Sequence, residues 1–261
     1  MGAKLTISRL GKQYPSDKPG SPVTVLDNID LGLDAGSFVS IVGVNGSGKT
    51  TLLRIIAGLE QPSWGVIMLN GVPVEGRTDC IGMVFQELAL FPWRTTMQNI
   101  EMGLEIKKMP SQKRRAMAME YIHAFGLAGF ESKFPKELSG GMRQKVAIAR
   151  TLVTNPELVL MDEPFSALDS QTRNNLQGFL LDVWGRRRET ILFVTHSLDE
   201  AVFLSDQIVV ISSIPAKVLE VIPVDLPRPR DRTSIAANLL RKKIFDLLYG
   251  REGSAVESEA V

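Results

Sequence analysis

The stretch Gly43 to Thr51, GVNGSGKTT, determines how the rest of the chain is interpreted. It fits the pattern G-x-x-x-x-G-K-[ST], with Gly43, Gly48, Lys49 and Thr50 at the fixed positions. In a folded protein this pattern requires a strand before it and a helix after it.

Both flanks supply that context. The run before the pattern, 37–42 (SFVSIV), is short, apolar and rich in β-branched residues, which is typical of a strand. The run after it, 50–58, has apolar residues at helical spacing and ends on a glycine. The sequence therefore predicts a strand, a tight loop and a helix at this place.

The chemistry follows from backbone geometry. Gly43, Gly46 and Gly48 can adopt dihedral angles that turn successive N–H groups inward, and the next helix directs its positive end to the same point. Lys49 adds a charge for the β- and γ-phosphates, and the Thr50 hydroxyl is placed to ligate a bridging Mg²⁺. We expect ATP to be bound here by Gly43, Val44, Asn45, Gly46, Ser47, Gly48, Lys49, Thr50 and Thr51.

Composition narrows the class of protein. The 261 residues are 44% hydrophobic, which is enough for a substantial core. Thirty basic residues against 29 acidic ones give a net charge of +1, so no global field favours nucleic acid or an anionic membrane. The single cysteine, Cys80, lies in an apolar run and suits a buried thiol in a reducing compartment. No apolar run is long enough for a signal peptide or a membrane span, so we expect a soluble, cytoplasmic chain.

Hydrophobic patterning predicts an α/β fold. Strands are expected at 4–10, 23–33, 37–42, 66–69, 72–74, 80–85, 158–161, 190–195 and 207–212, and helices at 50–58, 111–125, 140–154 and 234–249. Asn70-Gly71 predicts a hairpin between the strands at 66–69 and 72–74. A Pro/Gly/Ser loop is expected at 15–22, and a frayed tail at 251–261. The pattern indicates a mostly parallel core sheet covered on both faces, with an antiparallel β part and a helical part.

Two further segments carry chemistry. The apolar strand 158–163 (LVLMDE) ends in Asp162, which can hold Mg²⁺ through water, and Glu163, which can orient or deprotonate an attacking water. The segment 138–144 (LSGGMRQ) opens a helix, with Ser139 as its cap and two glycines that let the backbone approach an anion. A second phosphate site in one chain is the unusual feature.

Together, LSGG with the following R-Q, and then LVLMDEP, resemble the ATP-binding cassette family, whose signature is LSGGQ. The resemblance runs from about Leu5 to Ser212 and implies a P-loop NTPase fold of the cassette type. It implies one cassette domain at 1–222, a helical subdomain inserted at about 87–157, and a C-terminal extension at 223–261.

The resemblance also assigns residues. Tyr14 matches the aromatic that stacks on adenine, Gln86 the Q-loop glutamine, Asp169 the D-loop aspartate and His196 the switch histidine. By this resemblance the catalytic residues are Glu163, His196, Lys49 and Gln86, the Mg²⁺ ligands are Thr50, Gln86 and Asp162, and the second phosphate contact comes from Ser139, Gly140 and Gly141 with Asp169. Met142 departs from the family glutamine, and little loss of catalysis is expected because its neighbours make the phosphate contacts.

In this family one ATP meets the P-loop of one copy and the signature of another, so the resemblance implies a head-to-tail dimer with a second copy or a close paralogue. A single cassette with no membrane segment implies a peripheral motor on the cytoplasmic face of the cell membrane, bound to permease subunits. The segment 87–99, with Phe91 and Trp93 in a loop, is interpreted as the docking surface for the permease, although core packing is the alternative.

The segments LALFPWRTTMQNIEMGL and THSLDEAVFLSDQIVVISSIPAKV resemble the nitrate, sulfonate and taurine importer group. That resemblance implies ATP-driven uptake of a small, often anionic, nutrient delivered by a binding protein, with no nucleic-acid partner. The alternatives are a soluble cassette ATPase acting on ribosomes or DNA, for which the near-neutral charge is unfavourable, and the ATPase of an exporter. The transported substrate and the role of the extension stay open.

Overall fold

The computed structural model describes residues 2–16 and 22–250. Part of the expected loop at 15–22 and the whole of the expected frayed tail at 251–261 lie outside them. The chain divides into two units, Met1–Thr78 with Thr190–Val261 and Asp79–Glu189, and each is described by itself. Across the described parts of both units, no helix combines the length and the apolar character needed to cross a membrane.

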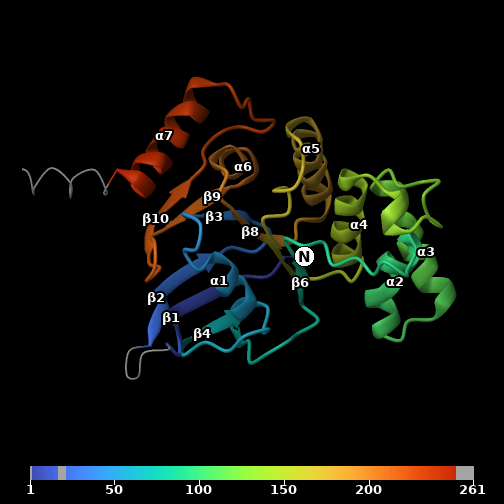
Figure 1. The fold of residues 1–261 in the computed structure, drawn as a ribbon, viewed down its shortest axis with the longest axis horizontal. Coiled ribbons are helices and arrows are strands. Elements are labelled where there is room, and N and C mark those ends of the chain that lie inside the picture. The colour runs from blue at the N-terminus through green and yellow to red at the C-terminus, as the bar shows by residue number, and fades with distance from the viewer. Residues whose placement is uncertain (1, 17–21, 251–261) are drawn as a thin grey trace, which may run out of the picture. The chain divides into compact units, whose positions relative to one another are not determined.

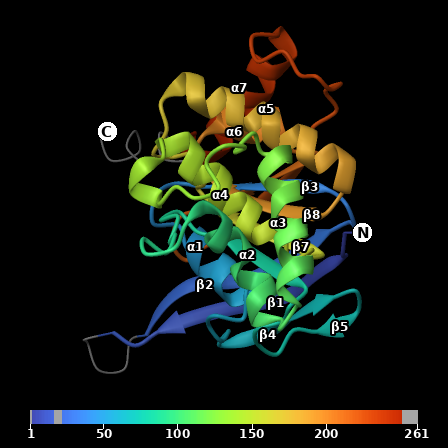
Figure 2. The ribbon, with the colours of Figure 1, turned by 90° about the vertical axis from the view of Figure 1, so that its right-hand side faces the viewer.

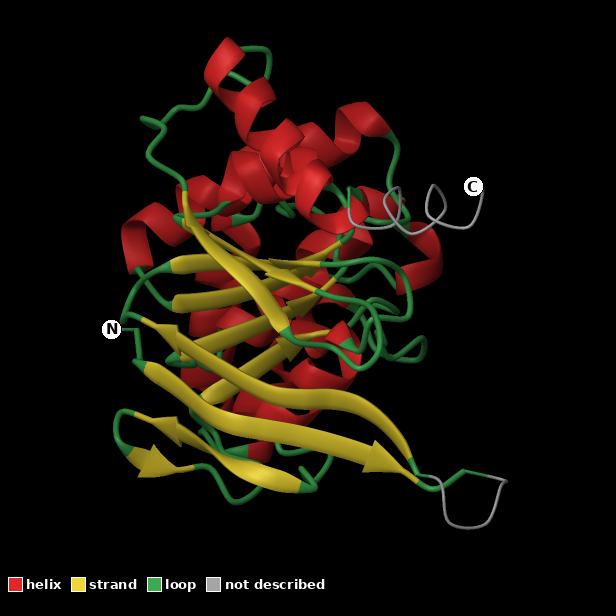
Figure 3. Cartoon of the chain, turned by 90° about the vertical axis from the view of Figure 1, so that its left-hand side faces the viewer, coloured by secondary structure: helices red, strands yellow, loops and turns green. Residues whose placement is uncertain are grey.

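The first unit contains an antiparallel sheet. Its strand order is β2 (Val23–Leu33), β1 (Leu5–Tyr14), β4 (Trp64–Leu69) and β5 (Val72–Pro73), and β1 and β2 form the long ribbon of Figure 3. The β4–β5 hairpin turns at Asn70 and Gly71, which both have positive φ, 52° and 79°. This confirms the hairpin expected from Asn-Gly, because a two-residue turn of that hand needs residues that tolerate left-handed backbone. The first strand is longer than expected, since it continues to Tyr14.

The same unit contains parallel strands. β3 (Phe38–Val42) pairs in parallel with β8 (Thr190–Thr195) and with β9 (Gln207–Ile211), and β10 (Val218–Pro223) adds to β9 in antiparallel fashion. Every residue of β3 and β8 is buried, which explains why these strands read as continuous apolar runs in the sequence. The expected strands here are confirmed, whereas β10 has no counterpart among them.

The described part of this unit contains three helices: α1 (Lys49–Ile56), α6 (Leu198–Leu204) and α7 (Ile235–Tyr249). α7 lies beside α6 and β10 in Figure 1 and buries Ala237 and Ile244 in the same core cluster as Ala201 and Val210. The C-terminal extension therefore packs on α6 and the neighbouring strands of this unit through an apolar helix face.

The second unit is mostly helical. It comprises β6 (Ile81–Val84) and β7 (Leu158–Asp162), which pair in parallel, the helices α2 (Thr96–Ile106), α3 (Ser111–Ala124), α4 (Gly140–Leu152) and α5 (Ser170–Arg187), and a 3₁₀ turn at Pro135–Glu137. Figure 2 shows α2, α3 and α4 grouped together. These helices confirm the helical character expected for this region from its helix-forming sequence.

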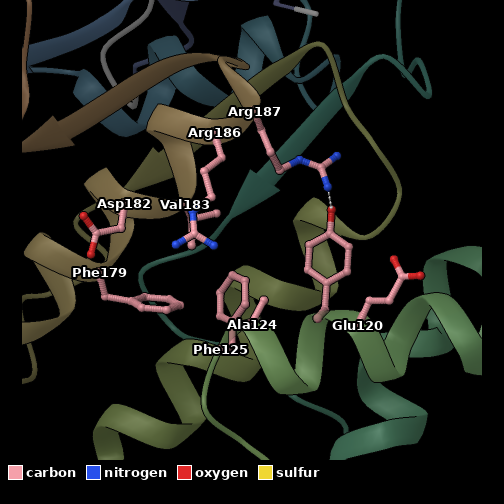
Figure 4. Close-up of a pocket in the computed structure, with 9 residues that line it drawn as sticks. Glu120, Ala124, Phe125, Phe179, Asp182, Val183, Arg186 and Arg187 are labelled. Atoms are coloured by element: carbon pink, nitrogen blue, oxygen red, sulfur yellow. Dashed lines mark hydrogen bonds between the residues drawn. The ribbon is translucent and has the colours of Figure 1, made fainter.

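Tyr121 and Arg187 fasten α3, α4 and α5 to one another. The Tyr121 hydroxyl donates to the carbonyl of Leu152 at 2.8 Å, in the last turn of α4, and accepts from Arg187 at the end of α5 (Figure 4). Burial raises the pKa of Tyr121 to about 12. These contacts border a cavity of about 360 Å³ between α3 and α5, floored by Phe125 and Phe179.

Tyr121→Phe is expected to lower the free energy of unfolding by about 1–2 kcal/mol, because the Leu152 carbonyl at a helix end and the Arg187 guanidinium both lose a partner. Urea unfolding followed by circular dichroism measures the change. Tyr249→Phe, at an exposed position on α7, is the matched control and should change stability by less than about 0.5 kcal/mol. Equal stability of the two variants would contradict this role.

Candidate nucleotide-binding site

The loop Gly43–Gly48 connects β3 to α1, as the sequence predicts. Gly46 and Gly48 have φ of 77° and 90°, which is left-handed backbone that costs other residues free energy. A side chain at Gly48 would also lie 2.9 Å from the Cγ1 of Val25. Glycine is therefore required at Gly48 by both its dihedral angles and its surroundings.

The loop presents a positive, uncapped helix start. Lys49 is 5% exposed, and its Nζ donates to the carbonyls of Gly43 and Val44, each at 2.9 Å, so the ammonium group folds over the loop. No side chain caps α1 at Gly48, and its first turn has no acidic residue. The backbone N–H groups at this helix start suit a phosphate, which fits the triphosphate that the sequence predicts.

Parallel pairing brings His196 to the same edge of the sheet as this loop. In the β3–β8 register Val42 lies opposite Thr195, so Gly43 and His196 both follow the carboxyl ends of neighbouring strands. His196 is exposed, whereas Thr195 is buried. The carboxyl edge of parallel strands is where α/β folds bind ligands.

Tyr14 ends β1 with its side chain held on two sides. Its hydroxyl donates to the carboxylate of Glu60, and the Lys12 ammonium lies 4.9 Å from the ring centroid. Lys12 and Glu60 also form an ion pair at 2.9 Å. Burial, followed by the hydrogen bond to Glu60, raises the pKa of Tyr14, and a hydrogen bond with the Thr51 side chain acts in the opposite direction. Tyr14 therefore lies beside the first turn of α1.

In the second unit, parallel pairing gathers Gln86, Asp162 and Glu163. Val84 lies opposite Met161 in the β6–β7 register, so these three residues come at or just after the ends of the two strands. Asp162 is 4% exposed, Glu163 is half-buried, and Gln86 is exposed.

Glu163 has an unusual backbone. Its φ is 42°, a left-handed value that costs a residue with a β-carbon free energy. Its carbonyl accepts from the backbone N–H and the hydroxyl of Ser166, at 3.2 and 3.0 Å, which closes a turn behind it. Such strain is concentrated at functional sites, because the surrounding structure must fix a side chain in one direction.

The signature segment and the D-loop are neighbours in this unit. Ser139 caps α4 by accepting from the N–H of Met142 at 3.2 Å, which confirms its expected capping role. A Cβ on Gly141 would lie 2.8 Å from the Thr172 methyl group at the start of α5, so this position has little room for a side chain. Asp169 caps α5, and the backbone N–H of Thr172 holds its pKa below the usual range.

The loop after Gln86 is held by two polar side chains that the sequence did not single out. Asn99 is fully buried and bonds to backbone groups of Phe91, Arg94 and Thr95. Arg150 donates to the carbonyls of Leu88 and Ala89, at 2.8 and 2.7 Å.

This loop exposes an aromatic side chain. Trp93 is 70% exposed, and its ring meets the half-buried ring of Phe91 edge-on with centroids 5.4 Å apart. The loop thus presents an exposed aromatic on a fixed backbone.

The predicted residues therefore form three groups. Tyr14, the loop at 43–51 and His196 gather in the first unit, and Gln86, Asp162 and Glu163 gather in the second. The signature at 139–141 and Asp169 form a further group in the second unit. Sequence reasoning missed Lys12 and Glu60, although strand alternation places Lys12 on the face of Tyr14.

Comparisons with known proteins agree with this geometry. Residues 26–166 match the family model described as ABC transporter. An uncharacterized ABC transporter ATP-binding protein of Methanocaldococcus jannaschii is 50% identical over 95% of this chain and 92% of its own length. An aliphatic sulfonates import ATP-binding protein of Bacillus cereus (92% of this chain, 95% of its own length) and a nitrate import ATP-binding protein of Synechocystis (93% and 94%) are each 42% identical.

A solved structure also matches. A dimeric ATP-binding cassette in a post-hydrolysis state, bound to ADP and Pi, has a TM-score of 0.74 and 31% identity to this chain. The match covers 84% of this chain and 98% of that one. The fold is thus that of the cassette ATPases. With the phosphate-binding loop, the signature helix and these relatives in agreement, the chain belongs to the ABC transporter family, as an ATP-binding subunit that hydrolyses ATP coupled to transport.

Proposed function

We propose that this chain is the motor subunit of an importer for a small anionic nutrient of the sulfonate or nitrate type. The observation that carries the proposal is the pair of relatives named for sulfonate and nitrate import, each 42% identical over more than nine-tenths of both lengths. Both names specify an oxyanion. Which oxyanion this chain serves is decided by the subunits that bind it.

In the first unit, the amides of the loop at 43–48 and Lys49 hold the phosphates of ATP, and Tyr14 stacks on the adenine. His196 contacts the γ-phosphate from the end of the adjacent strand. The uncapped start of α1 and the shared edge of β3 and β8 support these assignments. Glu60 and Lys12 keep the Tyr14 ring in one orientation, which lowers the entropy lost on stacking.

In the second unit, Glu163 positions the attacking water and accepts its proton. Its strained backbone and the turn closed by Ser166 support that role, because they fix the direction of the carboxylate. Gln86 and Asp162 are the residues of this unit that would hold Mg²⁺, and oxygen donors of this kind suit it. The ion would neutralise charge on the phosphates.

The signature residues Ser139, Gly140 and Gly141, with Asp169 beside them, act on the nucleotide of a second copy or a close paralogue. The dimeric cassette with ADP and Pi supports this arrangement. Closure of the dimer would exclude water from the γ-phosphate, and hydrolysis would reopen it.

The segment 87–99 receives a permease subunit, which places the chain at the cytoplasmic face of the membrane. The exposed Trp93 supports docking, because an aromatic side chain on a loop that is already ordered loses little conformational entropy when a partner binds. A binding protein would reach this subunit only through the permease.

Glu163→Gln should lower ATP turnover at least about 100-fold while leaving ATP affinity within about twofold, since an amide cannot accept the proton of water. Phosphate release and binding of a fluorescent ATP analogue measure the two quantities. Asp182→Asn, an exposed acid on α5, serves as the control and should turn over normally. Undiminished hydrolysis by Glu163→Gln would remove this residue from the chemistry.

Trp93→Ala should abolish co-purification of a multi-span membrane protein with the tagged chain while ATPase activity of the isolated chain persists. Little stability should be lost, because Trp93 is 70% exposed. Ile106→Ala, with 68% exposure in the same unit, is the matched control and should retain the membrane partner. Retention of that partner by both variants would rule out docking through Trp93.

A further inference from the structure

Four arginines of the C-terminal extension contact α6, the short helix that begins two residues after His196. They are Arg228, Arg230, Arg232 and Arg241, and we call them the arginine clamp. Three come from the polar, proline-rich segment 223–232, to which the sequence pattern assigned no role, and the fourth comes from α7.

Two members of the clamp hold the C-terminal end of α6. Arg230 donates to the carbonyls of Val202 at 2.9 Å and Ser205 at 2.6 Å, and Arg228 donates to that of Leu204. The last carbonyls of a helix lack partners within it and carry a partial negative charge, so guanidinium groups satisfy and stabilise them. Burial lowers the pKa of Arg230 to about 10, so it stays charged at neutral pH.

Of the other two members, Arg241 holds the first turn of α6, and Arg232 holds Phe203 near the end of the helix. Arg241 of α7 pairs with Asp199 in the first turn of α6 and donates to the backbone carbonyl of Arg232 at 2.7 Å. The guanidinium of Arg232 lies 3.5 Å from the ring centroid of Phe203, which is a close cation–π contact. Both ends of α6 are thus fixed by the extension.

The first turn of α6 is joined to the residues on either side of His196. Glu200 is 4% exposed, and its carboxylate accepts from the Thr195 hydroxyl at 2.6 Å. The Thr195 oxygen in turn accepts from the N–H of Ser197 at 3.0 Å, and the Ser197 hydroxyl caps the N–H of Glu200. These bonds form a closed ring of Thr195, Ser197 and Glu200 with His196 between its members.

A buried carboxylate in such a ring needs a compensating charge. Glu200 and Phe203 are three residues apart on α6, so the Arg232 guanidinium over the Phe203 ring lies on the side of the helix that carries Glu200. Burial lowers the pKa of Arg232, and the negative charge of Glu200 acts in the opposite direction. Arg232 thus links the extension to the ring around His196.

We propose that the C-terminal extension positions His196 for ATP hydrolysis, with Arg232 and Glu200 as the positioning residues that fix the backbone on both sides of the histidine. The inference rests on the proposed role of His196 at the γ-phosphate. It gives the extension a part in turnover that lies outside the P-loop, the signature and the acidic pair.

A double-mutant cycle tests the proposal. Arg232→Met is made in the natural chain and in His196→Ala, because methionine can keep the packing against Phe203 while the charge is removed. We expect Arg232→Met to lower kcat about fivefold in the natural chain, to leave KM for ATP within about twofold, and to add less than about 1.5-fold in the His196→Ala background. Equal losses in both backgrounds, or no loss in the natural chain, would overturn the proposal.

Two further comparisons separate positioning from folding. Glu200→Gln keeps an oxygen that can accept from Thr195, so it should retain more than about half of kcat, whereas Glu200→Ala should lose about as much as Arg232→Met. Lys243→Met removes a cation of the same extension that pairs with Glu220 outside the clamp, and it should turn over normally. Equal kcat in Glu200→Ala and Glu200→Gln would refute the ring. A natural chain that hydrolyses no ATP would instead refute the proposed function.

Discussion

In each unit the candidate site depends on two parallel strands whose carboxyl ends lie at the same edge of the sheet. In the first unit the β3–β8 pairing sets Gly43 and His196 side by side, and in the second the β6–β7 pairing does the same for Gln86 and the acids at 162–163. A shift of one residue in either register would move the residues of a strand to the opposite face of the sheet. The buried apolar runs that fix the register therefore also fix the chemistry.

Glycine supplies the second constraint. The left-handed backbone at Gly46 and Gly48 leaves the start of α1 open to a phosphate, and the close approach of Gly141 to α5 joins the signature helix to the D-loop. Glu163 adopts a left-handed backbone without being glycine. This backbone destabilises the folded chain at the place where a carboxylate must point in one direction.

The local sequence pattern was sufficient to predict many of the strands, turns and helix caps. The hairpin at Asn70-Gly71, the buried strands and the cap at Ser139 each follow from a few adjacent residues. What escaped prediction depends on distant partners. The strand β10 exists because β9 offers it an edge, and the pairing of Lys12 with Glu60 joins segments far apart in the chain. The arginines at 228–232 read as a polar loop because the carbonyls that they bind belong to α6.

In the proposed mechanism one nucleotide is shared between two copies, since the chain carries a predicted phosphate-binding loop and a separate signature helix. Native mass spectrometry of the Glu163→Gln chain with Mg²⁺ and ATP tests this most directly. We expect a species of two chains that retains two ATP molecules, and we expect its loss when Ser139→Arg is also introduced. Single chains that each retain one ATP, unaffected by the change at Ser139, would contradict it.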